Sequence, residues 1–351
     1  MEDRKNKVSN LISLHRKNNF DLLRLIAAFG VLVSHSYGIL NKGLEQPMLL
    51  YGNSRIILSD IGLFIFFTIS GFLVTQSLLR SISIIHYLRK RFMRIWPGLV
   101  VVNIFCFTMG GFVSGFSWKE YLSNASPWLY VVKNSSLVVI EYHIEGVFTN
   151  LRNTAVNASL WTILMEIKFY LLLSVMRFHS LFTNRILLLA GFILLCVARG
   201  LYISMADKNS IVDTYLLFGS YFYLGSILHF LKAFHQFKWL YAVVLWVLFF
   251  IMPQQAIKEI LLTISIGYTV VMFGNTKQLI DLKGNDISYG FYLYAFPVQQ
   301  LVLLFGGYHT PVWMHVLYST IITVPLAWAS WHIVEKRFLQ RKSLTNKEPS
   351  T

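Results

Sequence analysis

The hydrophobic residues of this chain form long runs separated by short polar connections. Stretches such as 57–79, 184–203 and 312–334 contain few or no charged side chains. A helix of about 20 apolar residues crosses the hydrocarbon core of a bilayer. Hydropathy therefore predicts ten membrane-spanning helices, which is the typical signature of a polytopic membrane protein. The predicted spans are 20–40, 57–79, 95–115, 156–178, 184–203, 212–231, 239–252, 256–275, 287–306 and 312–334.

The composition supports an all-α integral membrane fold in contact with a lipid bilayer. Hydrophobic residues make up 55% of the 351 residues and charged residues 13%, whereas soluble domains carry about 25% charged residues. The net charge is +15, but the basic residues lie between apolar spans and form no single stripe. Nucleic acid is therefore not an expected partner. Cys106 and Cys196 lie inside apolar stretches, so we expect neither a disulfide framework nor a metal site.

The distribution of Lys and Arg predicts the orientation of the chain. With a cytoplasmic N-terminus, 21 of the 31 Lys and Arg residues lie on the cytoplasmic side and 7 on the outer side. Cytoplasmic loops carry an excess of Lys and Arg, so both termini are expected in the cytoplasm. The predicted organisation is a cytoplasmic tail at 1–19, a transmembrane domain at 20–335 and a second cytoplasmic tail at 336–351. No cleaved signal peptide is expected.

The longest predicted connection, residues 116–155, lies on the outer side. It is rich in Trp, Tyr and Asn and carries mixed charge. A loop of this length is usually functional or disordered. Its aromatic residues are typical of an interfacial belt or of a surface that stacks on sugars, and the sequence leaves both interpretations open.

Ionisable residues inside predicted spans are the first candidates for function, because they are costly in a membrane. Arg24 and His35 both lie in the first span. Eleven residues of helix separate them by roughly 16 Å along one face. A neutral imidazole at His35 can accept a proton from a hydroxyl at near-neutral pH. The alternative is a snorkelling arginine and a histidine that is hydrogen-bonded within the bundle.

Glu166 lies near the middle of the fourth span and is expected to face the bundle interior. Its carboxylate could orient His35 or stabilise its imidazolium form, as the acid partner does in triad-type sites. A structural carboxylate paired with another polar group is the alternative. The histidines near the end of the chain, His309, His315 and His332, are expected to be structural or interfacial.

Arg91 and Arg94 precede the third span, three residues apart, and would point the same way on a helix. Paired guanidiniums suit the phosphates of a nucleotide-containing donor. Basic residues at this position are also typical of ordinary positive-inside topology, which is the simpler interpretation when the motif is taken alone.

Six segments, in order along the chain, resemble the acyltransferase-3 family of integral-membrane acyltransferases. The first is FDLLRLIAAFGVLVSH, in which ten residues separate Arg24 from His35. The others resemble the family's second span, its two-arginine motif, its fourth span and its last two spans. They are FFTISGFLVTQSLL, RFMR, SLWTILMEIKFYLLL, ISYGFYLYAFPVQQ and VEKRF.

This resemblance implies ten spans in a bacterial inner membrane and transfer of an acyl group, usually acetyl from acetyl-CoA. The implied acceptor is a sugar hydroxyl of a surface polysaccharide or of its lipid-linked precursor. By position, His35 would be the catalytic histidine and Arg24 its partner arginine. Arg91 and Arg94 would engage the phosphates of CoA, and Glu166 matches the acid of the fourth span.

Two positions depart from the family pattern. Many members have an aromatic-His-aromatic-Pro run in the ninth span, where this chain has Ala295 in place of the histidine. The family often shows Glu-Lys-Pro near the end, where this chain has Arg337 after Glu335 and Lys336. Two other functions remain open on the sequence alone. The intramembrane charges would also suit a transporter or flippase, and the chain could be a scaffold for polysaccharide assembly.

Overall fold

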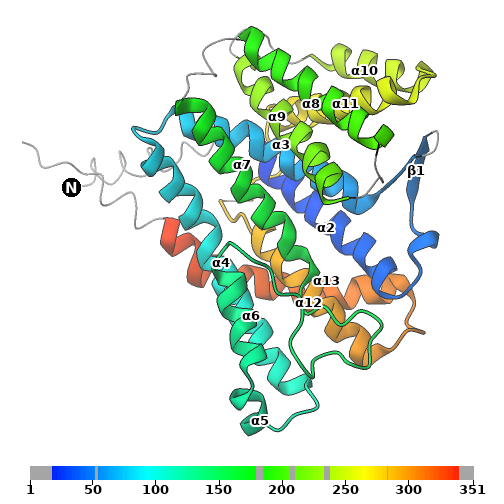
Figure 1. Ribbon diagram of the computed structural model, residues 1–351. Helices are drawn as coiled ribbons and strands as arrows, with labels where there is room; N and C mark the ends of the chain where they lie inside the picture. Colours follow the sequence, from blue (N-terminus) through cyan, green and yellow to red (C-terminus); the bar gives the residue numbers. More distant parts are fainter. Residues whose placement is uncertain are drawn as a thin grey trace, which may run out of the picture.

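The computed structural model describes residues 18–51, 54–178, 185–205, 210–232, 238–282 and 284–339. Helices dominate these ranges, and one short antiparallel hairpin interrupts them (Figure 1). The α-helices are α2 (Phe20–Ile39), α3 (Leu58–Leu79), α4 (Ile84–Val113), α5 (Trp118–Ser123), α6 (Ala125–Ser135), α7 (Trp161–Phe178), α8 (Arg185–Met205), α9 (Ile211–Lys232), α10 (Trp239–Ile251), α11 (Gln255–Gly274), α12 (Ser288–Gly306) and α13 (Val312–Ser330). The remaining elements are η1 (Gly43–Glu45), β1 (Met48–Tyr51), β2 (Ser54–Ile57), η2 (Ala158–Leu160) and the π-helical η4 (Trp331–Glu335).

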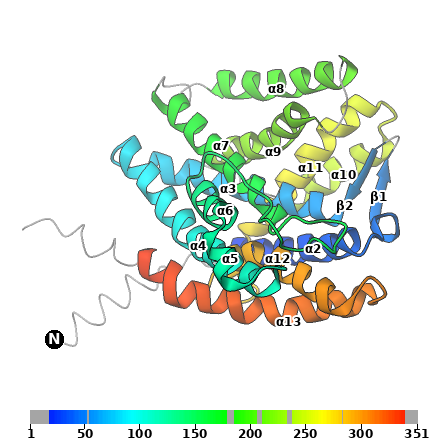
Figure 2. The same cartoon turned by 60° about the horizontal axis from the view of Figure 1, so that its bottom comes forward.

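Each predicted span coincides with one helix, which confirms the all-α membrane class. In the described ranges, 7 helices are long and apolar enough to cross a membrane. They are α2, α3, α4, α7 together with η2, α9, α11, and α13 together with η4 and the residues that follow it. The remaining predicted spans correspond to α8, α10 and α12, so the number ten stays a prediction. Among these, α10 has 13 residues and pairs with α11, while α8 packs on the outside of α9 (Figure 2).

The third helix begins earlier than the sequence predicts. The basic segment before residue 95 is predicted to be a loop, but α4 is continuous from Ile84 to Val113. The Ser83 side chain caps this helix by accepting a hydrogen bond from the His86 backbone N–H at 3.1 Å. Arg91 and Arg94 therefore lie on a helix, where the sequence had predicted a loop.

Part of the predicted outer connection is also helical. Helix α6 packs along α4, and Trp96 donates from Nε1 to the Ser135 carbonyl at 3.0 Å. Tyr121 and Tyr130 are fully buried, whereas Trp118 and Trp128 are exposed. The segment 116–155 is thus a packed, partly helical structure rather than an open loop, and its exposed tryptophans suit a membrane interface.

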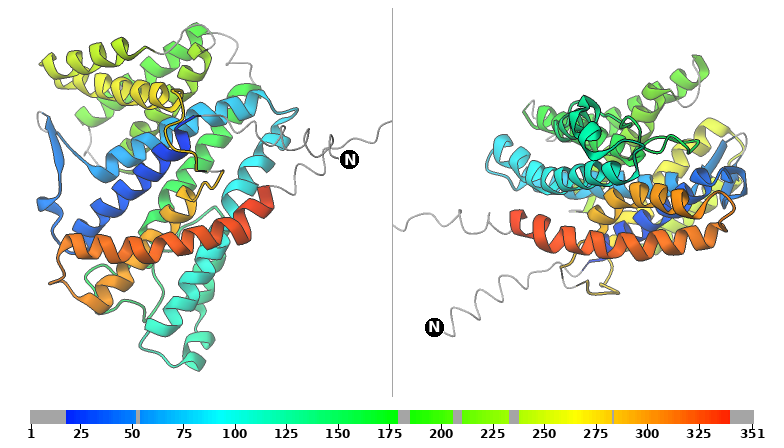
Figure 3. Two further views of the ribbon diagram at one scale, coloured as in Figure 1. Left: turned by 180° about the vertical axis from the view of Figure 1, so that it is seen from behind. Right: turned by 90° about the horizontal axis from the view of Figure 1, so that it is seen from below.

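Several helix ends that the predicted topology places on the same side of the membrane are in contact with one another. At the start of α2, the Asn19 N–H donates to the Gly274 carbonyl at the end of α11. Near the start of α4, Arg94 contacts both Asp286, just before α12, and Glu335, in η4 after α13. Helix α13 runs beside α12 and past α2 (Figure 3). Alternating spans require this grouping of ends. That this side faces the cytoplasm remains a prediction from charge.

Helices α3 and α9 pack in direct backbone contact. A Cβ atom added at Gly71 would lie 1.9 Å from the Phe222 carbonyl oxygen, and one added at Gly225 would lie 2.2 Å from the Thr68 carbonyl oxygen. Both distances are below van der Waals contact, so only glycine fits at these positions. Small residues at a helix crossing allow this approach, which gives membrane helices their packing energy.

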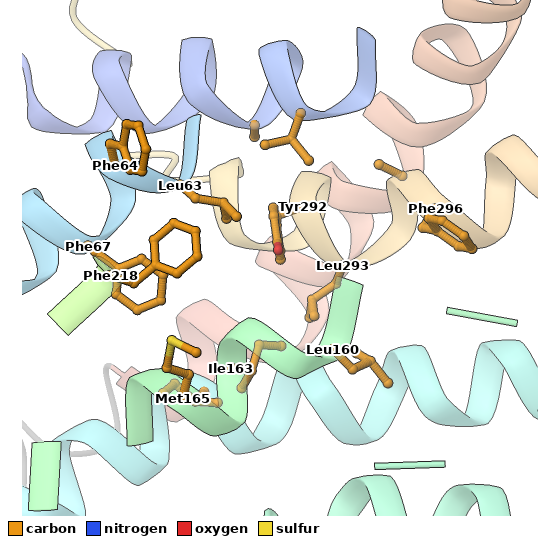
Figure 4. Packing of buried hydrophobic residues seen from close by; sticks show 14 of the residues in the cluster. Leu63, Phe64, Phe67, Leu160, Ile163, Met165, Phe218, Tyr292, Leu293 and Phe296 are labelled. Atoms are coloured by element: carbon orange, nitrogen blue, oxygen red, sulfur yellow. The ribbon is translucent and has the colours of Figure 1, made fainter. Parts of the chain in front are cut away.

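Helix α12 lies in the interior of the bundle. Its residues from Phe291 to Gln300 are all buried. Tyr292 and Leu293 point from it towards apolar side chains of α3, η2 and α7 (Figure 4). Because protein surrounds α12 on all sides, it can carry buried amides such as Gln299 and Gln300. This explains why its composition differs from that of a lipid-facing span.

Candidate active site

A cavity of about 100 Å³ lies between α2, α3, α4, α7 and α12. Four of the residues singled out from the sequence line it, namely Arg24, Arg91, Arg94 and Glu166. We call this space the arginine cavity. The fold therefore gathers residues that lie up to 142 positions apart in the chain, counted from Arg24 to Glu166. Three guanidiniums and one carboxylate line the arginine cavity, and a guanidinium that is not paired with a carboxylate can attract an anionic ligand.

Glu166 forms a compact hydrogen-bonded group on one wall of the arginine cavity. Ser70 donates to its Oε1 at 2.5 Å, and the hydroxyl of Tyr170 donates to the same oxygen. The Ser70 and Tyr170 oxygens are themselves 3.2 Å apart. Two hydroxyl donors compensate the carboxylate for the loss of water. Neither partner stands out in the sequence pattern.

Arg94 occupies the centre of an ion-pair cluster. Its guanidinium donates to the carboxylate of Asp286, and Glu335 lies 3.6 Å away. Arg94 also lies over the rings of Tyr289 and Trp331, at 5.7 and 5.5 Å from the ring centroids. Bulky, delocalised guanidinium groups suit such stacked and paired sites. Arg94 is therefore already neutralised by protein carboxylates.

Asp286 bridges two of the arginines. Besides its bond to Arg94, its carboxylate lies 3.7 Å from the guanidinium of Arg24. Ser288 donates a hydrogen bond to Asp286 at 2.5 Å. Burial would raise the pKa of Asp286, but Arg94 and Arg24 hold the pKa below its ordinary value. Asp286 is thus a carboxylate that joins α2, α4 and the start of α12.

No pattern in the sequence indicated the role of Asp286 or the pairing of Glu335 with Arg94. Asp286 lies in a predicted cytoplasmic loop, where acidic residues are common and do not indicate a functional site. Glu335 falls in the π-helix at 331–335, which places both Trp331 and Glu335 against Arg94. Single π-turns within helices occur often at functional sites. Only the tertiary fold shows that these residues surround one guanidinium.

Arg91 differs from Arg94 in its partners. Its Nη2 donates to the Ser77 hydroxyl at 3.3 Å. Its Nε is buried, and within the described part of the chain nothing accepts a hydrogen bond from it. In those same ranges no carboxylate forms an ion pair with Arg91, in contrast to Arg24 and Arg94. Arg91 therefore retains donor capacity for an anionic ligand.

His35 lies apart from the other candidates. It does not line the arginine cavity, and its ring meets that of Phe296 edge-on at 5.5 Å. Its Nδ1 is buried and finds no hydrogen-bond partner among the described residues. A buried polar atom without a partner is unusual and marks a position where a ligand can supply the missing bond.

The expected contact between Glu166 and His35 is not seen. No hydrogen bond links these two side chains in the described ranges, and Ser70 and Tyr170 occupy the carboxylate instead. Phe66 and Tyr292 also line the arginine cavity and meet edge-on at 5.5 Å. Tyr292 is one helical turn before Phe296, the ring that touches His35. An aromatic layer on α12 thus borders both the cavity and the histidine.

His315 is structural, in line with its sequence interpretation. It is fully buried, and its Nε2 lies 3.1 Å from the Gln299 carbonyl. That carbonyl can only accept, so Nε2 carries the proton, and Nδ1 lies 3.0 Å from the Ser36 hydroxyl oxygen. Gln299 in turn donates to Ser36 at 2.7 Å. This network fixes α13 to α2 beside His35.

Metal ligands are not grouped in the part of the molecule that the structure describes, where no three His, Cys, Asp or Glu side chains could hold an ion together. The two cysteines are both free thiols. Cys106 is buried in α4, and Cys196 is half-buried in α8.

A helical membrane bundle that surrounds intramembrane arginine, glutamate and histidine side chains defines a polytopic membrane protein with a polar internal site. The acyltransferase-3 family pattern, described as an acyltransferase domain, matches residues 17–332. The chain therefore belongs to this family and is an integral-membrane acyltransferase. This assignment favours the enzyme over the transporter and scaffold alternatives.

Two curated relatives are similar over nearly their full lengths. The O-acetyl transferase of Shigella phage Sf6 is 30% identical over 347 residues, which cover 94% of this chain and 98% of that protein. Nodulation protein 10 of Rhizobium leguminosarum bv. viciae is 28% identical over 359 residues, which cover 93% of this chain and 95% of that protein. No solved structure matches the chain significantly.

Proposed function

We propose that this enzyme transfers an acetyl group from acetyl-CoA to a sugar hydroxyl of a bacterial surface polysaccharide or of its lipid-linked precursor. The proposed location is the bacterial inner membrane. The observation that carries the proposal is the arginine cavity, in which Arg91 forms no ion pair with a carboxylate of the described residues and keeps a buried N–H without an acceptor. The O-acetyl transferase among the relatives supports the acetyl group and the oxygen acceptor.

In this proposal the donor binds with its negative end among the arginines. A cavity of about 100 Å³ accommodates an acyl group, whereas whole small-molecule ligands occupy about 300–1,000 Å³. The nucleotide of acetyl-CoA therefore lies outside the cavity, at the start of α4. Arg91 is the first candidate to bind its phosphates, since it has no carboxylate partner among the described residues. Arg94 would contribute after exchanging Asp286 for phosphate.

His35 is the proposed catalytic residue. As a general base it takes the proton of the sugar hydroxyl while the oxygen attacks the thioester carbonyl. The C–S bond then breaks, and the thiolate leaves as CoA and takes up a proton. Transient acylation of His35 itself is the other route. Glu166 is proposed to act from the cavity wall through Ser70 and Tyr170, and Arg24 to hold the donor.

The test is the acetyl content of the surface polysaccharide, measured by proton NMR in a deletion strain that expresses each variant at matched membrane abundance. Wild type should restore the acetyl signals, and His35→Ala should not. Loss of a general base costs about 10²–10⁴-fold in rate. His309→Ala, at an exposed histidine outside both the cavity and the His315 network, is the matched control.

Retention of acetyl signals by His35→Ala would contradict its catalytic role. If wild type itself does not restore any acetyl group, the proposed reaction is wrong. Glu166→Gln should lower the acetyl signal less than His35→Ala does, because both hydroxyls donate to the same oxygen and the amide oxygen of glutamine can still accept both hydrogen bonds.

A further inference from the structure

A second and much larger cavity lies at the opposite end of α2. Its volume is about 1220 Å³, and its wall includes the β1–β2 hairpin and parts of α2, α3, α8, α9 and α11. Figure 2 shows the hairpin beside the ends of α2 and α11. We call this space the hairpin cavity. Its lining comes from segments that the charge distribution places on the outer side of the membrane.

The hairpin cavity is polar and nearly balanced in charge. Three basic and four acidic side chains line it, whereas three basic and one acidic side chain line the arginine cavity. A space with a small negative excess disfavours the several phosphates of a CoA donor. It suits a ligand with many hydroxyl groups, which can donate to carboxylates and accept from guanidinium and amide groups.

An ion-pair triad organises one wall of the hairpin cavity. Arg199 of α8 bonds Asp213 of α9 and Glu259 of α11, each at 2.9 Å. The three side chains are 16%, 8% and 15% exposed, so they are fixed in place yet line the cavity. Tyr221 and Phe64 also line the cavity, and their rings stack with centroids 4.1 Å apart. Fixed charged groups of both signs are suited to hold the hydroxyl groups of a sugar, which both donate and accept hydrogen bonds.

The hairpin cavity reaches close to His35. Gly38 lines it and is three residues beyond His35 on the same helix, a rise of about 4.5 Å. Gln46, another lining residue, accepts a hydrogen bond at 2.7 Å from Ser34, which precedes His35. Arg24 lines the arginine cavity near the other end of α2. His35 thus lies along α2 between two cavities of different charge.

We propose that the hairpin cavity binds the carbohydrate acceptor, with Arg199, Asp213 and Glu259 facing its hydroxyl groups. This inference rests on the proposed function for the identity of the reaction. The volume exceeds the range of about 300–1,000 Å³ typical of small-ligand sites. The occupant is therefore an oligosaccharide rather than a single sugar.

Gly43 offers a position at which a large side chain can be introduced into the wall of the hairpin cavity. It lines the cavity, and a Cβ atom added there would meet nothing within 4 Å. Gly43→Trp therefore introduces an indole at the wall of this space, at a position where the first side-chain atom meets no neighbour. Gly115→Trp is the matched control, because Gly115 also has open space around its Cβ position but lines neither cavity.

The first measurement is binding without donor. The probe is the set of oligosaccharides released from the unacetylated surface polysaccharide of the deletion strain, titrated against the full-length purified protein. Wild type and Gly115→Trp should bind equally, and Gly43→Trp should bind at least tenfold more weakly. Equal binding by Gly43→Trp, or no binding by wild type, overturns the acceptor assignment.

The second measurement separates this inference from the proposed function. With acetyl-CoA present, Gly43→Trp should raise KM for the oligosaccharides at least tenfold and leave KM for acetyl-CoA within twofold. If the oligosaccharides bind in the expected pattern but no acetyl group is transferred, the proposed reaction is contradicted and the acceptor assignment still holds. Transfer with an unchanged acceptor KM in Gly43→Trp would contradict the acceptor site and keep the reaction. Equal melting temperatures of the two tryptophan variants verify that both fold.

Discussion

The guanidinium of Arg94 donates a hydrogen bond to the carboxylate of Asp286, although the two residues are 192 positions apart in the chain. Glu335 approaches the same guanidinium from the end of the bundle's last helix. One side chain of α4 is thus held by the segments before α12 and after α13. An arginine expected from the sequence to meet phosphate is, in the fold, also the centre of a structural cluster.

Loss of Arg94 should therefore destabilise the protein as well as reduce its activity. Arg94→Met leaves the buried Asp286 and Glu335 without their main partner, and breaking a buried pair costs about 3–5 kcal/mol. The measurement is thermal unfolding in detergent, with a double-mutant cycle that includes Asp286→Asn.

Lys133 and Glu141 provide the comparison for that cycle. They form an ion pair at 2.7 Å whose side chains are 39% and 31% exposed. Lys133→Met should change stability by less than about 1 kcal/mol, as is usual for exposed pairs. If Arg94→Met were no more harmful than Lys133→Met, the cluster would not be a structural element.

Stability should depend on pH through Asp286. Its pKa is held below the ordinary value in the folded state, chiefly by Arg94 against the opposing effect of burial. Such a carboxylate stabilises the fold above its unfolded pKa of about 3.9 and loses this contribution as pH falls through its lower folded pKa. The melting temperature should drop below about pH 4 in wild type and drop less steeply in Asp286→Asn. Parallel curves for the two proteins would contradict this assignment.

Arg91→Ala should weaken donor binding without a large loss of stability. The Ser77 hydroxyl is the one hydrogen-bond acceptor of Arg91 among the described residues. Removal of the Arg91 side chain therefore leaves no buried carboxylate without its partner. Hydrogen bonds to charged groups contribute about 1.5–3 kcal/mol, which corresponds to a rise of about 10–100-fold in KM for acetyl-CoA. Steady-state kinetics at two salt concentrations measures this effect.

Arg89→Ala is the control for Arg91→Ala, since Arg89 is exposed on the same helix. It should leave KM for acetyl-CoA nearly unchanged. Equal effects from both substitutions would mean that general positive charge, rather than the position of Arg91, attracts the donor.

Gly71→Ala should destabilise the contact between α3 and α9. The new methyl group would lie 1.9 Å from the Phe222 carbonyl oxygen, so one backbone must move. Overpacking of this kind costs about 1–3 kcal/mol. Gly200→Ala, in α8, meets nothing within 4 Å and should leave the melting temperature the same or slightly higher. A melting temperature for Gly71→Ala equal to wild type would show that the helices can part.

Hydropathy was sufficient to predict the class of fold and the position of each apolar helix. Hydropathy did not predict helix boundaries that depend on capping or on packing against another helix. Ser83 caps α4 well before the apolar run begins, and the 116–155 segment folds because α6 packs on α4. Helix α12 shows a second weakness of hydropathy. It lies in the interior of the bundle, and its buried amides and tyrosines lower the mean hydropathy of the segment.

Four of the cavity residues are identifiable from the sequence because charges inside or beside spans are rare. Their partners are not, since Ser70, Tyr170 and Asp286 are ordinary residues whose positions matter only once distant helices meet. Of the two alternatives for Glu166, the structure shows the pairing with other polar side chains, Ser70 and Tyr170, and periodicity alone did not decide between them. Helix periodicity gives the face of one helix but not its neighbour across the bundle.

The glycine contact between α3 and α9 joins two helices that line different cavities. No side chain lies between the backbones at Gly71 and Gly225, so no change of rotamer can separate them. Leu63 and Ser70 of α3 line the arginine cavity, and Tyr221 of α9 lines the hairpin cavity. The walls of the two cavities are therefore joined through main-chain atoms, at positions where any substitution can only add bulk.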